Sequence, residues 1–133
     1  MRVRELMQDD VISVNLDTLI NDAVVTLTDA HISALPVVDD GGRMVGVVSS
    51  TDVLTSEAEA NDAVEREALF EQMMVRDIMT RRPLTVSPDA EVREAAQQML
   101  YADVHRLFVI ADDKVVGVIS TTDIVRAVAT GNL

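Results

Sequence analysis

Residues 104–125, VHRLFVIADDKVVGVISTTDIV, have the pattern of a strand, a tight turn, a second strand and the start of a helix. A His-Arg pair, His105 and Arg106, stands near the beginning of this stretch, and a Gly-x-x-Ser-x-x-Asp run ends it at Asp123. The same order of features occurs once earlier, in ISALPVVDDGGRMVGVVSSTDVL at residues 32–54. The chain is therefore predicted to contain two copies of one small unit.

Alignment of the sequence with itself supports this duplication. At an offset of 72 residues, VRELM at 3–7 aligns with VRDIM at 75–79. The second turn is one residue shorter, so the offset falls to 71, and GVVS at 46–49 aligns with GVIS at 117–120. Because either half alone would bury little apolar surface, we expect the two copies to share one core.

Each copy begins with a short lead-in that ends at Met7 or Met79, followed by a short strand at 11–14 or 84–86 and then a helix. Asn15 and Ser87 are expected to cap these helices, with Pro88 in the first helical position. Apolar residues at i, i+3, i+4 and i+7 predict one buried face on each helix: Ile20, Ala23, Val24 and Leu27 in the first copy, and Val92, Ala95, Ala96 and Met99 in the second.

Two further strands and a second helix complete each copy. The strands at 35–38 and 44–49 flank the turn DDGG, and those at 107–110 and 115–120 flank the shorter turn ADD. Their nearly continuous apolar runs are typical of strands buried on both faces. With second helices that begin near Thr51 and Thr122, each copy is predicted to be β-α-β-β-α, an α/β fold.

Residues 55–74 have no counterpart after the second copy. They are rich in Ala and Glu and lack Gly and Pro, so we expect a largely helical segment with Val64, Leu69, Phe70 and Met73 on its apolar face. We interpret it as a linker helix that packs on its own domain or on a second subunit; a partner-binding helix is the alternative. The predicted organisation is repeat 1 at 1–56, a helical linker at 57–74 and repeat 2 at 75–133.

Composition excludes several classes of site. The 133 residues contain no cysteine, which excludes disulfides, zinc-thiolate sites and thiol catalysis. Apolar residues make up 48% but aromatic residues only 2%, so the core must consist mainly of aliphatic side chains and Met. No apolar run is long enough to span a bilayer, and the first ten residues, MRVRELMQDD, lack the apolar stretch of a secretory signal. We therefore expect a cytoplasmic protein without a membrane partner.

The net charge of −12 is large for this length, and only one of the 11 cationic residues, Lys114, is a lysine. This balance favours a halophilic protein, adapted to a salt-rich cytoplasm; an ordinary acidic protein is the alternative. At about 1 M salt the screening length is only about 3 Å, so the charge would not repel an anionic ligand at a distance. Without an overall basic field, we expect no nucleic-acid partner.

Two groups of polar residues could bind a ligand. Asp52 and Asp123 end the runs SSTD and STTD, where a strand passes into a helix. Such a carboxylate can accept hydrogen bonds from both hydroxyls of a ribose, although these side chains could instead simply cap the helix. His105 and Arg106 offer donors that suit phosphate oxygens, although an ordinary ion pair and a half-buried His are the alternative.

The usual catalytic constellations are missing. The chain has two His, no Cys and no Gly-rich phosphate loop of the Walker or Rossmann kind, so we expect no enzyme and no catalytic residue. The paired Asp residues at 39–40 and 112–113 fit hairpin turns better than metal sites.

Two β-α-β-β-α copies that each end in Gly-Val-(Val/Ile)-Ser-x-Thr-Asp-(Val/Ile) resemble a tandem pair of CBS domains, often called a Bateman module. The resemblance covers essentially the whole chain and extends to adenine-nucleotide-sensing pairs such as those of the gamma subunit of AMP-activated protein kinase. It implies that the two copies pack about a pseudo-twofold axis and that clefts between them bind AMP, ADP, ATP or S-adenosylmethionine. It also implies that two modules form a disc-like homodimer.

The resemblance further implies roles for single residues. Asp52 and Asp123 would bind ribose, while Ile12 and Leu84 would lie against the base. His105 and Arg106 would contact phosphate, whereas the first copy has Ser33 and Ala34 there, so the two sites are unequal. Arg81 and Arg82 could serve phosphate or merely be solvated. The expected ligand-binding residues are Ile12, Ser33, Ala34, Ser49, Thr51, Asp52, Thr80, Arg82, Leu84, His105, Arg106, Ser120, Thr122 and Asp123.

The leading hypothesis is a regulatory module that binds an adenine nucleotide or a related adenosyl compound, needs no cofactor and signals to a separate effector protein. The alternative is a structural module that dimerises or docks a partner with empty clefts. An enzyme that acts on a nucleotide is a weaker third hypothesis, because the acid-base and nucleophile sets are missing.

Overall fold

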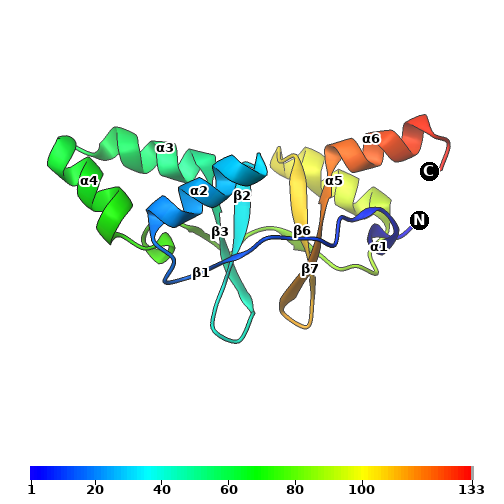
Figure 1. Ribbon diagram of the computed structural model, residues 1–133. Helices are drawn as coiled ribbons and strands as arrows, with labels where there is room; N and C mark the ends of the chain where they lie inside the picture. The colour runs from blue at the N-terminus through cyan, green and yellow to red at the C-terminus, as the bar shows by residue number, and fades with distance from the viewer. Residues whose placement is uncertain (133) are drawn as a thin grey trace. The chain divides into compact units, whose positions relative to one another are not determined.

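The structure, a computed structural model, describes residues 1–132 apart from the side chains of Leu69 and Phe70 (Figure 1). It is an α/β chain of two compact units. The repeat-1 unit is Ile12–Pro83, and the repeat-2 unit combines Met1–Val11 with Leu84–Leu133. The predicted β-α-β-β-α order is confirmed in both copies.

The repeat-1 unit contains a four-stranded sheet in the order β1-β2-β3-β4. Strand β1 pairs with β2 in parallel, and the other two pairs are antiparallel. As predicted, α2 buries Ile20, Ala23 and Leu27. The elements are β1 (Val14–Asn15), α2 (Ile20–Ala30), β2 (Ala34–Val38), β3 (Met44–Ser49), α3 (Ser50–Glu59), α4 (Ala63–Gln72), the 3-10 turn η1 (Val75–Asp77) and β4 (Thr80–Arg81).

The repeat-2 unit has the corresponding sheet in the order β5-β6-β7, again with a parallel first pair and an antiparallel second pair. Helices α5 and α6 lie at the end of the β6-β7 hairpin that is opposite its turn (Figure 1). The elements are α1 (Val3–Leu6), β5 (Thr85–Val86), α5 (Val92–Ala102), β6 (Arg106–Ala111), β7 (Lys114–Ser120) and α6 (Thr121–Ala129).

Each unit has a hydrophobic core of its own. Leu35, Val37 and Val48 are buried in the repeat-1 cluster. The equivalent residues of the second copy, Leu107, Val109 and Ile119, are buried in the repeat-2 cluster. The expectation that the two copies share one core stays a prediction. The sheet of each unit is completed by a segment from outside its own sequence repeat.

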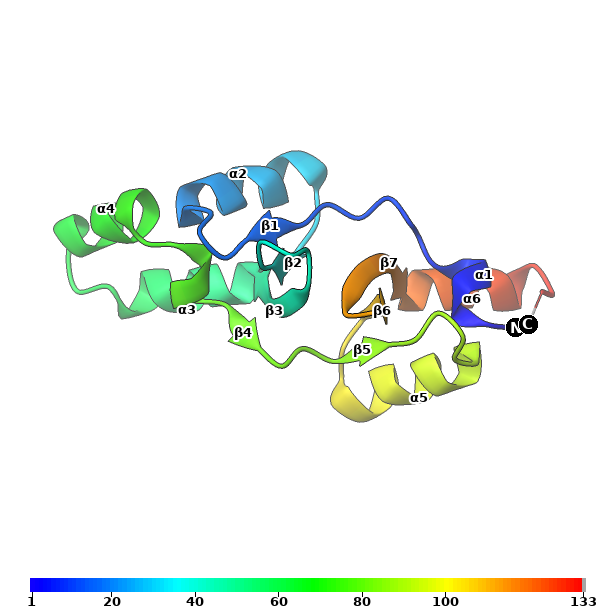
Figure 2. The same cartoon turned by 90° about the horizontal axis from the view of Figure 1, so that it is seen from below.

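That completing segment is the lead-in of the other repeat together with the residues that directly follow it, beginning at Gln8 or Thr80. From here on, lead-in means this longer segment. The first lead-in, at the N-terminus, packs on α6 and β7 of the repeat-2 unit (Figure 2). Its Gln8 and Val118 exchange two backbone hydrogen bonds of 2.8 and 2.9 Å. The second lead-in does the same in the repeat-1 unit, where Thr80 pairs with Val47. The two lead-ins are thus exchanged between the sequence repeats.

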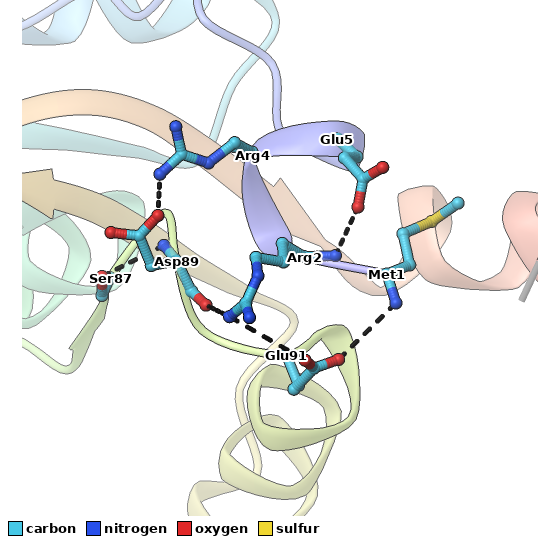
Figure 3. A network of polar contacts seen from close by, with 7 residues as sticks. All are labelled: Met1, Arg2, Arg4, Glu5, Ser87, Asp89 and Glu91. Carbon is cyan, nitrogen blue, oxygen red and sulfur yellow. Dashed lines mark hydrogen bonds and ion pairs between the residues drawn. The ribbon is translucent and has the colours of Figure 1, made fainter.

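An Arg–Asp pair secures each exchanged lead-in. Arg4 pairs with Asp89 in the repeat-2 unit (Figure 3), and Arg76 pairs with Asp17 in the repeat-1 unit. These four residues correspond at the offset of 72, so the two units use the same connection. Each ion pair is at least partly exposed, so it orients the lead-in more than it stabilises the fold.

The prediction that Asn15 and Ser87 cap the first helix of each repeat is wrong. Helices α2 and α5 begin several residues later, at Ile20 and Val92, and Pro88 is not helical. The Asn15 side-chain oxygen instead accepts a hydrogen bond of 2.9 Å from the backbone N–H of Asp17, and Ser87 does the same for Asp89 at 3.1 Å. Both side chains close local turns. These turns present the carboxylates that pair with the lead-in arginines.

The inserted segment is helical as predicted, because α3 extends to Glu59 and α4 follows it. Helix α4 contacts α2 and α3 and so packs on its own unit. Val64, expected on its apolar face, is 75% exposed, so that part of the prediction is wrong. The side chains of Leu69 and Phe70, expected beside it, lie outside the described residues.

We predict that Gly117→Ala lowers the free energy of unfolding by about 1–3 kcal/mol, measured by urea denaturation. A Cβ at Gly117 would lie 2.9 Å from the Gln8 carbonyl oxygen and 2.6 Å from Met7 Sδ. Gly46→Ala should act in the same way, with the Thr80 carbonyl oxygen 2.7 Å away. Gly41→Ala is the control, because the nearest atom to its Cβ would be 3.4 Å away. Equal stability of Gly117→Ala and Gly41→Ala would contradict the close contact.

Candidate functional site

The predicted site residues at the start of α3 and α6 form matching helix caps. The Ser49 hydroxyl accepts from the Asp52 N–H at 3.1 Å, and Asp52 Oδ2 accepts from the Ser49 N–H at 2.9 Å. Ser120 and Asp123 make the same reciprocal pair at 3.2 and 2.9 Å. The capping alternative is therefore observed in both repeats, and it holds one carboxylate oxygen of each Asp in place.

The second oxygen of each carboxylate is directed at a lead-in. Asp52 Oδ1 accepts from the Thr80 hydroxyl at 3.2 Å, and Asp123 Oδ1 accepts from Gln8 Nε2 at 3.3 Å. Gln8 is a site residue that sequence reasoning missed. The offset of 72 that aligns Gln8 with Thr80 was the signal that could have found it.

The His-Arg pair lies beside the start of α6. Arg106 is the cross-strand neighbour of Ser120, and the Thr121 N–H donates to the His105 carbonyl at 2.9 Å. The first copy repeats this geometry, with Ala34 opposite Ser49 and the Ser50 N–H donating to the Ser33 carbonyl at 2.9 Å. The beginning and the end of each strand hairpin therefore meet at a helix N-terminus, where the positive end of the helix dipole favours anions.

The two helix N-termini differ in burial and in charge. Asp123 is only 8% exposed, whereas Asp52 is half-buried. Asp123 Oδ1 also lies 3.8 Å from Nη1 of the exposed Arg126, and the corresponding residue of the first copy is Thr55. His105 is exposed and Arg106 is half-buried. The repeat-2 unit therefore has His105, Arg106 and Arg126 where the repeat-1 unit has Ser33, Ala34 and Thr55.

The remaining predicted residues lie on the surface. Ile12 and Leu84, which precede β1 and β5, are large apolar side chains that are 48% and 51% exposed. Thr51 and Thr122, in the first turns of α3 and α6, are exposed. Arg82 is exposed and has a positive φ of 56°.

The predicted ligand-binding residues are divided between the two units. Ile12, Ser33, Ala34, Ser49, Thr51, Asp52, Thr80 and Arg82 belong to the repeat-1 unit, and Leu84, His105, Arg106, Ser120, Thr122 and Asp123 to the repeat-2 unit.

Among residues 1–132, no group of three or more His, Asp or Glu side chains is arranged to hold a metal ion. In that same part of the chain, the helices are too short or too polar to cross a membrane. The candidate site residues themselves offer hydrogen bonding by carboxylate, hydroxyl and imidazole groups and charge pairing by Arg.

Comparison with known proteins identifies the family. The model of the CBS domain matches residues 3–59 and again 75–130, so the chain belongs to the CBS domain family and carries the domain as a tandem pair. This confirms the resemblance predicted from the two Gly-Val-(Val/Ile)-Ser-x-Thr-Asp motifs.

Two solved structures are similar along nearly the whole chain. The crystal structure of CBSX2, a protein of Arabidopsis thaliana, in complex with AMP has a TM-score of 0.83 and 30% identity and covers 99% of this chain and 98% of that one. The CBS domain pair of protein MJ0100, in complex with 5′-methylthioadenosine and S-adenosyl-L-methionine, has a TM-score of 0.81 and 25% identity and covers 98% of both chains.

Curated relatives are often longer than this chain. Protein MJ1225 of Methanocaldococcus jannaschii is 24% identical over 124 residues, which are 93% of this chain but 41% of that protein. The inosine-5′-monophosphate dehydrogenase of the same organism is 30% identical over 123 residues, and the chain spans 22% of its length. The chain therefore matches only a part of each of these two relatives.

We predict that Ser49→Ala and Ser120→Ala each lower the free energy of unfolding by about 1 kcal/mol, because each removes a helix cap. Urea denaturation measures the change. The control variants are Thr51→Ala and Thr122→Ala, which remove exposed hydroxyls from the same helical turns. If the Thr variants cost as much as the Ser variants, the capping assignment is wrong.

Proposed function

We propose that this CBS pair binds an adenine nucleotide (AMP, ADP or ATP) or a related adenosyl compound such as S-adenosylmethionine. The observation that carries the proposal is the repeated carboxylate geometry: the helix cap holds Oδ2 of Asp52 and Asp123, while Oδ1 is directed toward a single lead-in side chain. The adenosyl ligands of CBSX2 and of the MJ0100 CBS pair support the ligand class.

In this proposal the Asp carboxylate receives both ribose hydroxyls. Asp52 Oδ1 or Asp123 Oδ1 exchanges its weak bond with Thr80 or Gln8 for a bond from the ribose, and Ser49, Thr51, Ser120 and Thr122 supply nearby hydroxyls. A charge-assisted hydrogen bond of this kind contributes about 1.5–3 kcal/mol. The base lies against the exposed apolar side chain of Ile12 or Leu84, whose burial adds to affinity.

The two sites are proposed to differ at the ligand's 5′ end. His105 and Arg106 serve a phosphate in the repeat-2 unit, because they stand beside the N-terminus of α6. Ser33 and Ala34 make small contacts to sugar or base in the repeat-1 unit, where Arg82 is the predicted cationic residue. The repeat-2 site therefore favours anionic ligands more strongly than the repeat-1 site does.

The chain is further proposed to act as a cytoplasmic homodimer that passes its ligand state to a separate effector protein. No catalytic role is assigned to any residue, and no cofactor is required. The alternative is a structural module without a ligand. The capping bonds favour this alternative, because they already give both Asp carboxylates an intramolecular role.

We predict that calorimetric titration detects binding of AMP. Asp123→Asn should weaken the binding of both adenosine and AMP by about tenfold, because it removes one charge-assisted hydrogen bond. The Asn oxygen can still accept from the Ser120 N–H, so the helix cap is kept. Arg106→Ala should weaken the binding of AMP but not of adenosine. Arg93→Ala, which removes an equal charge from the first turn of α5, is the control.

Each result of this titration has a distinct meaning. Folded wild-type protein that binds none of AMP, ADP, ATP and S-adenosylmethionine would favour the structural module. Binding that is unchanged in Asp123→Asn would remove the ribose role, and equal losses for AMP and adenosine in Arg106→Ala would remove the phosphate role.

Adaptation to a salt-rich cytoplasm gives a separate prediction. The net charge of −12 makes the folded chain repel itself, and salt of about 1 M screens charges beyond about 3 Å. We expect the thermal unfolding midpoint, measured by circular dichroism, to rise by several degrees between about 0.1 M and about 1 M KCl. A midpoint that does not rise would argue for an ordinary acidic protein.

A further inference from the structure

A groove in the repeat-1 unit is lined by residues of helices α3 and α4 and of the turn η1 that follows them (Figure 1). Its volume is about 430 Å³, and its apolar lining consists of Ala60, Ala68, Met73 and Ile78. Met73 is 36% exposed and the other three are half-buried, so solvent reaches this apolar surface. Its burial by a bound molecule would be favourable.

Three carboxylates also line the groove. They are Glu59 of α3, Glu65 of α4 and Asp77 of η1, and all three residues are exposed. None of the lining residues that the structure describes is basic. These carboxylates do not form a metal-binding group among residues 1–132, so the chemistry that they offer is the pairing of separate cationic groups.

The two arginines of this part of the chain pair elsewhere. Arg66 Nε lies 3.1 Å from Glu57 Oε1, and Arg76 pairs with Asp17. None of these four residues lines the groove. Glu59 also stands in the last turn of α3, where the negative end of the helix dipole adds to the charge of its carboxylate. The groove therefore combines apolar surface with negative charge.

The repeat-2 unit has a groove at the equivalent place, with a different charge. It has a volume of about 350 Å³ and is lined by residues of α1 and α6. Glu5 lines it at the position that aligns with Asp77, but Thr130 takes the place of Glu59. Arg126 lines it as well. The lining with carboxylates and no basic residue is therefore a property of the first repeat and not a general product of the fold.

From these observations we propose that this groove is the docking site of the effector protein and receives an amphipathic helix whose polar face is rich in Lys or Arg. Its apolar side chains cover Met73 and Ile78, and its cations pair with Glu59, Glu65 and Asp77. An amphipathic helix laid in an apolar groove is a common mode of peptide recognition. The inference rests on the proposed signalling to a separate effector and names the chemistry of that partner.

Charge favours this occupant over others. A second copy of the chain carries a net charge of −12, so the carboxylates repel it, and they repel nucleic acid and anionic membranes in the same way. A small polycation could pair with the carboxylates but would leave the apolar lining exposed. Salt of about 1 M screens distant charges, whereas contact pairs partly withdrawn from water are screened much less.

Helix α3 connects the groove with the candidate ligand site. Its first turn contains Asp52 and its last turn contains Glu59. These two residues are about 10 Å apart along the helix axis, at 1.5 Å per residue. A ligand at Asp52 and a partner at Glu59 therefore contact the same helix, and a ligand that shifts α3 also shifts the lining of the groove.

Fluorescence anisotropy on the full chain, without adenosyl ligand and in about 0.1 M KCl, tests the proposal. The probe is a labelled synthetic peptide of about 18 residues of Leu and Lys, with Leu at i, i+3, i+4 and i+7. We expect it to bind, and the triple variant Glu59→Gln, Glu65→Gln, Asp77→Asn should bind it about tenfold more weakly, because each exposed pair contributes little alone. The amide oxygens can still accept the backbone hydrogen bonds of Glu65 and Asp77.

The matched control is the triple variant Asp22→Asn, Asp29→Asn, Glu67→Gln. It removes the same charge from exposed positions of the same unit that do not line the groove. Its affinity for the peptide should stay within about twofold of wild type, because charges farther away than the screening length contribute little. Circular dichroism establishes that each variant is folded.

A second pair of variants tests the groove by its shape. Ala68→Arg places a long cationic side chain in the groove and should abolish binding of the peptide. Ala58→Arg adds the same side chain at an exposed position of α3 that does not line the groove, and it should leave most of the binding intact.

Folded wild-type protein that does not bind the Leu/Lys peptide would overturn the proposal, and so would equal losses in the two triple variants or in the two Arg variants. Equally tight binding of a Ser/Lys peptide, or of spermine, would overturn the amphipathic helix as the occupant. Binding of AMP without binding of the peptide would overturn only the docking site. Binding of the peptide without binding of any adenosyl compound would overturn only the proposed ligand.

Discussion

The close contact between a lead-in backbone and a glycine of the neighbouring strand is the constraint on which both units depend. A Cβ at Gly46 would lie 2.7 Å from the Thr80 carbonyl oxygen, and a Cβ at Gly117 would lie 2.9 Å from the Gln8 carbonyl oxygen. This approach lets the lead-in pair with the edge strand of the sheet, and it brings the Thr80 and Gln8 side chains to the carboxylates of Asp52 and Asp123. A packing requirement of the fold thus also sets the polar contacts of the candidate site.

Local sequence patterns were sufficient to predict the repeat, the α2 and α5 faces and both hairpins, because each depends on residues close together in the chain. The exchange of lead-ins is a contact between distant segments and leaves no periodicity to detect. The error at Asn15 and Ser87 has the same origin. Either residue could cap a helix or close a turn. In the structure both close turns, and these turns present Asp17 to Arg76 and Asp89 to Arg4.

As with the fold, the features of the candidate site that depend on residues close together in the chain could be predicted from the sequence. A tight hairpin necessarily brings its two ends together, so the proximity of Arg106 and Ser120 could be inferred from the β6-β7 spacing. The pairing of Ser with Asp three residues later is itself a capping signature. The sequence could not reveal that Asp123 is nearly buried while Asp52 is half-buried, because burial depends on contacts with segments far away in the chain, such as the one between Gln8 and Asp123.

The exchanged lead-ins also bear on how such a chain can arise. In a chain with a single repeat, the lead-in would not pair with the sheet of its own repeat. The edge strand of that sheet would then have no lead-in as its neighbour. Two such chains could complete both sheets if each lead-in paired with the sheet of the other chain, as in a domain-swapped dimer. If the two chains were fused, the same exchange of lead-ins would take place within one molecule, and every contact would be kept. In the duplicated chain, both lead-ins find their sheets within one molecule.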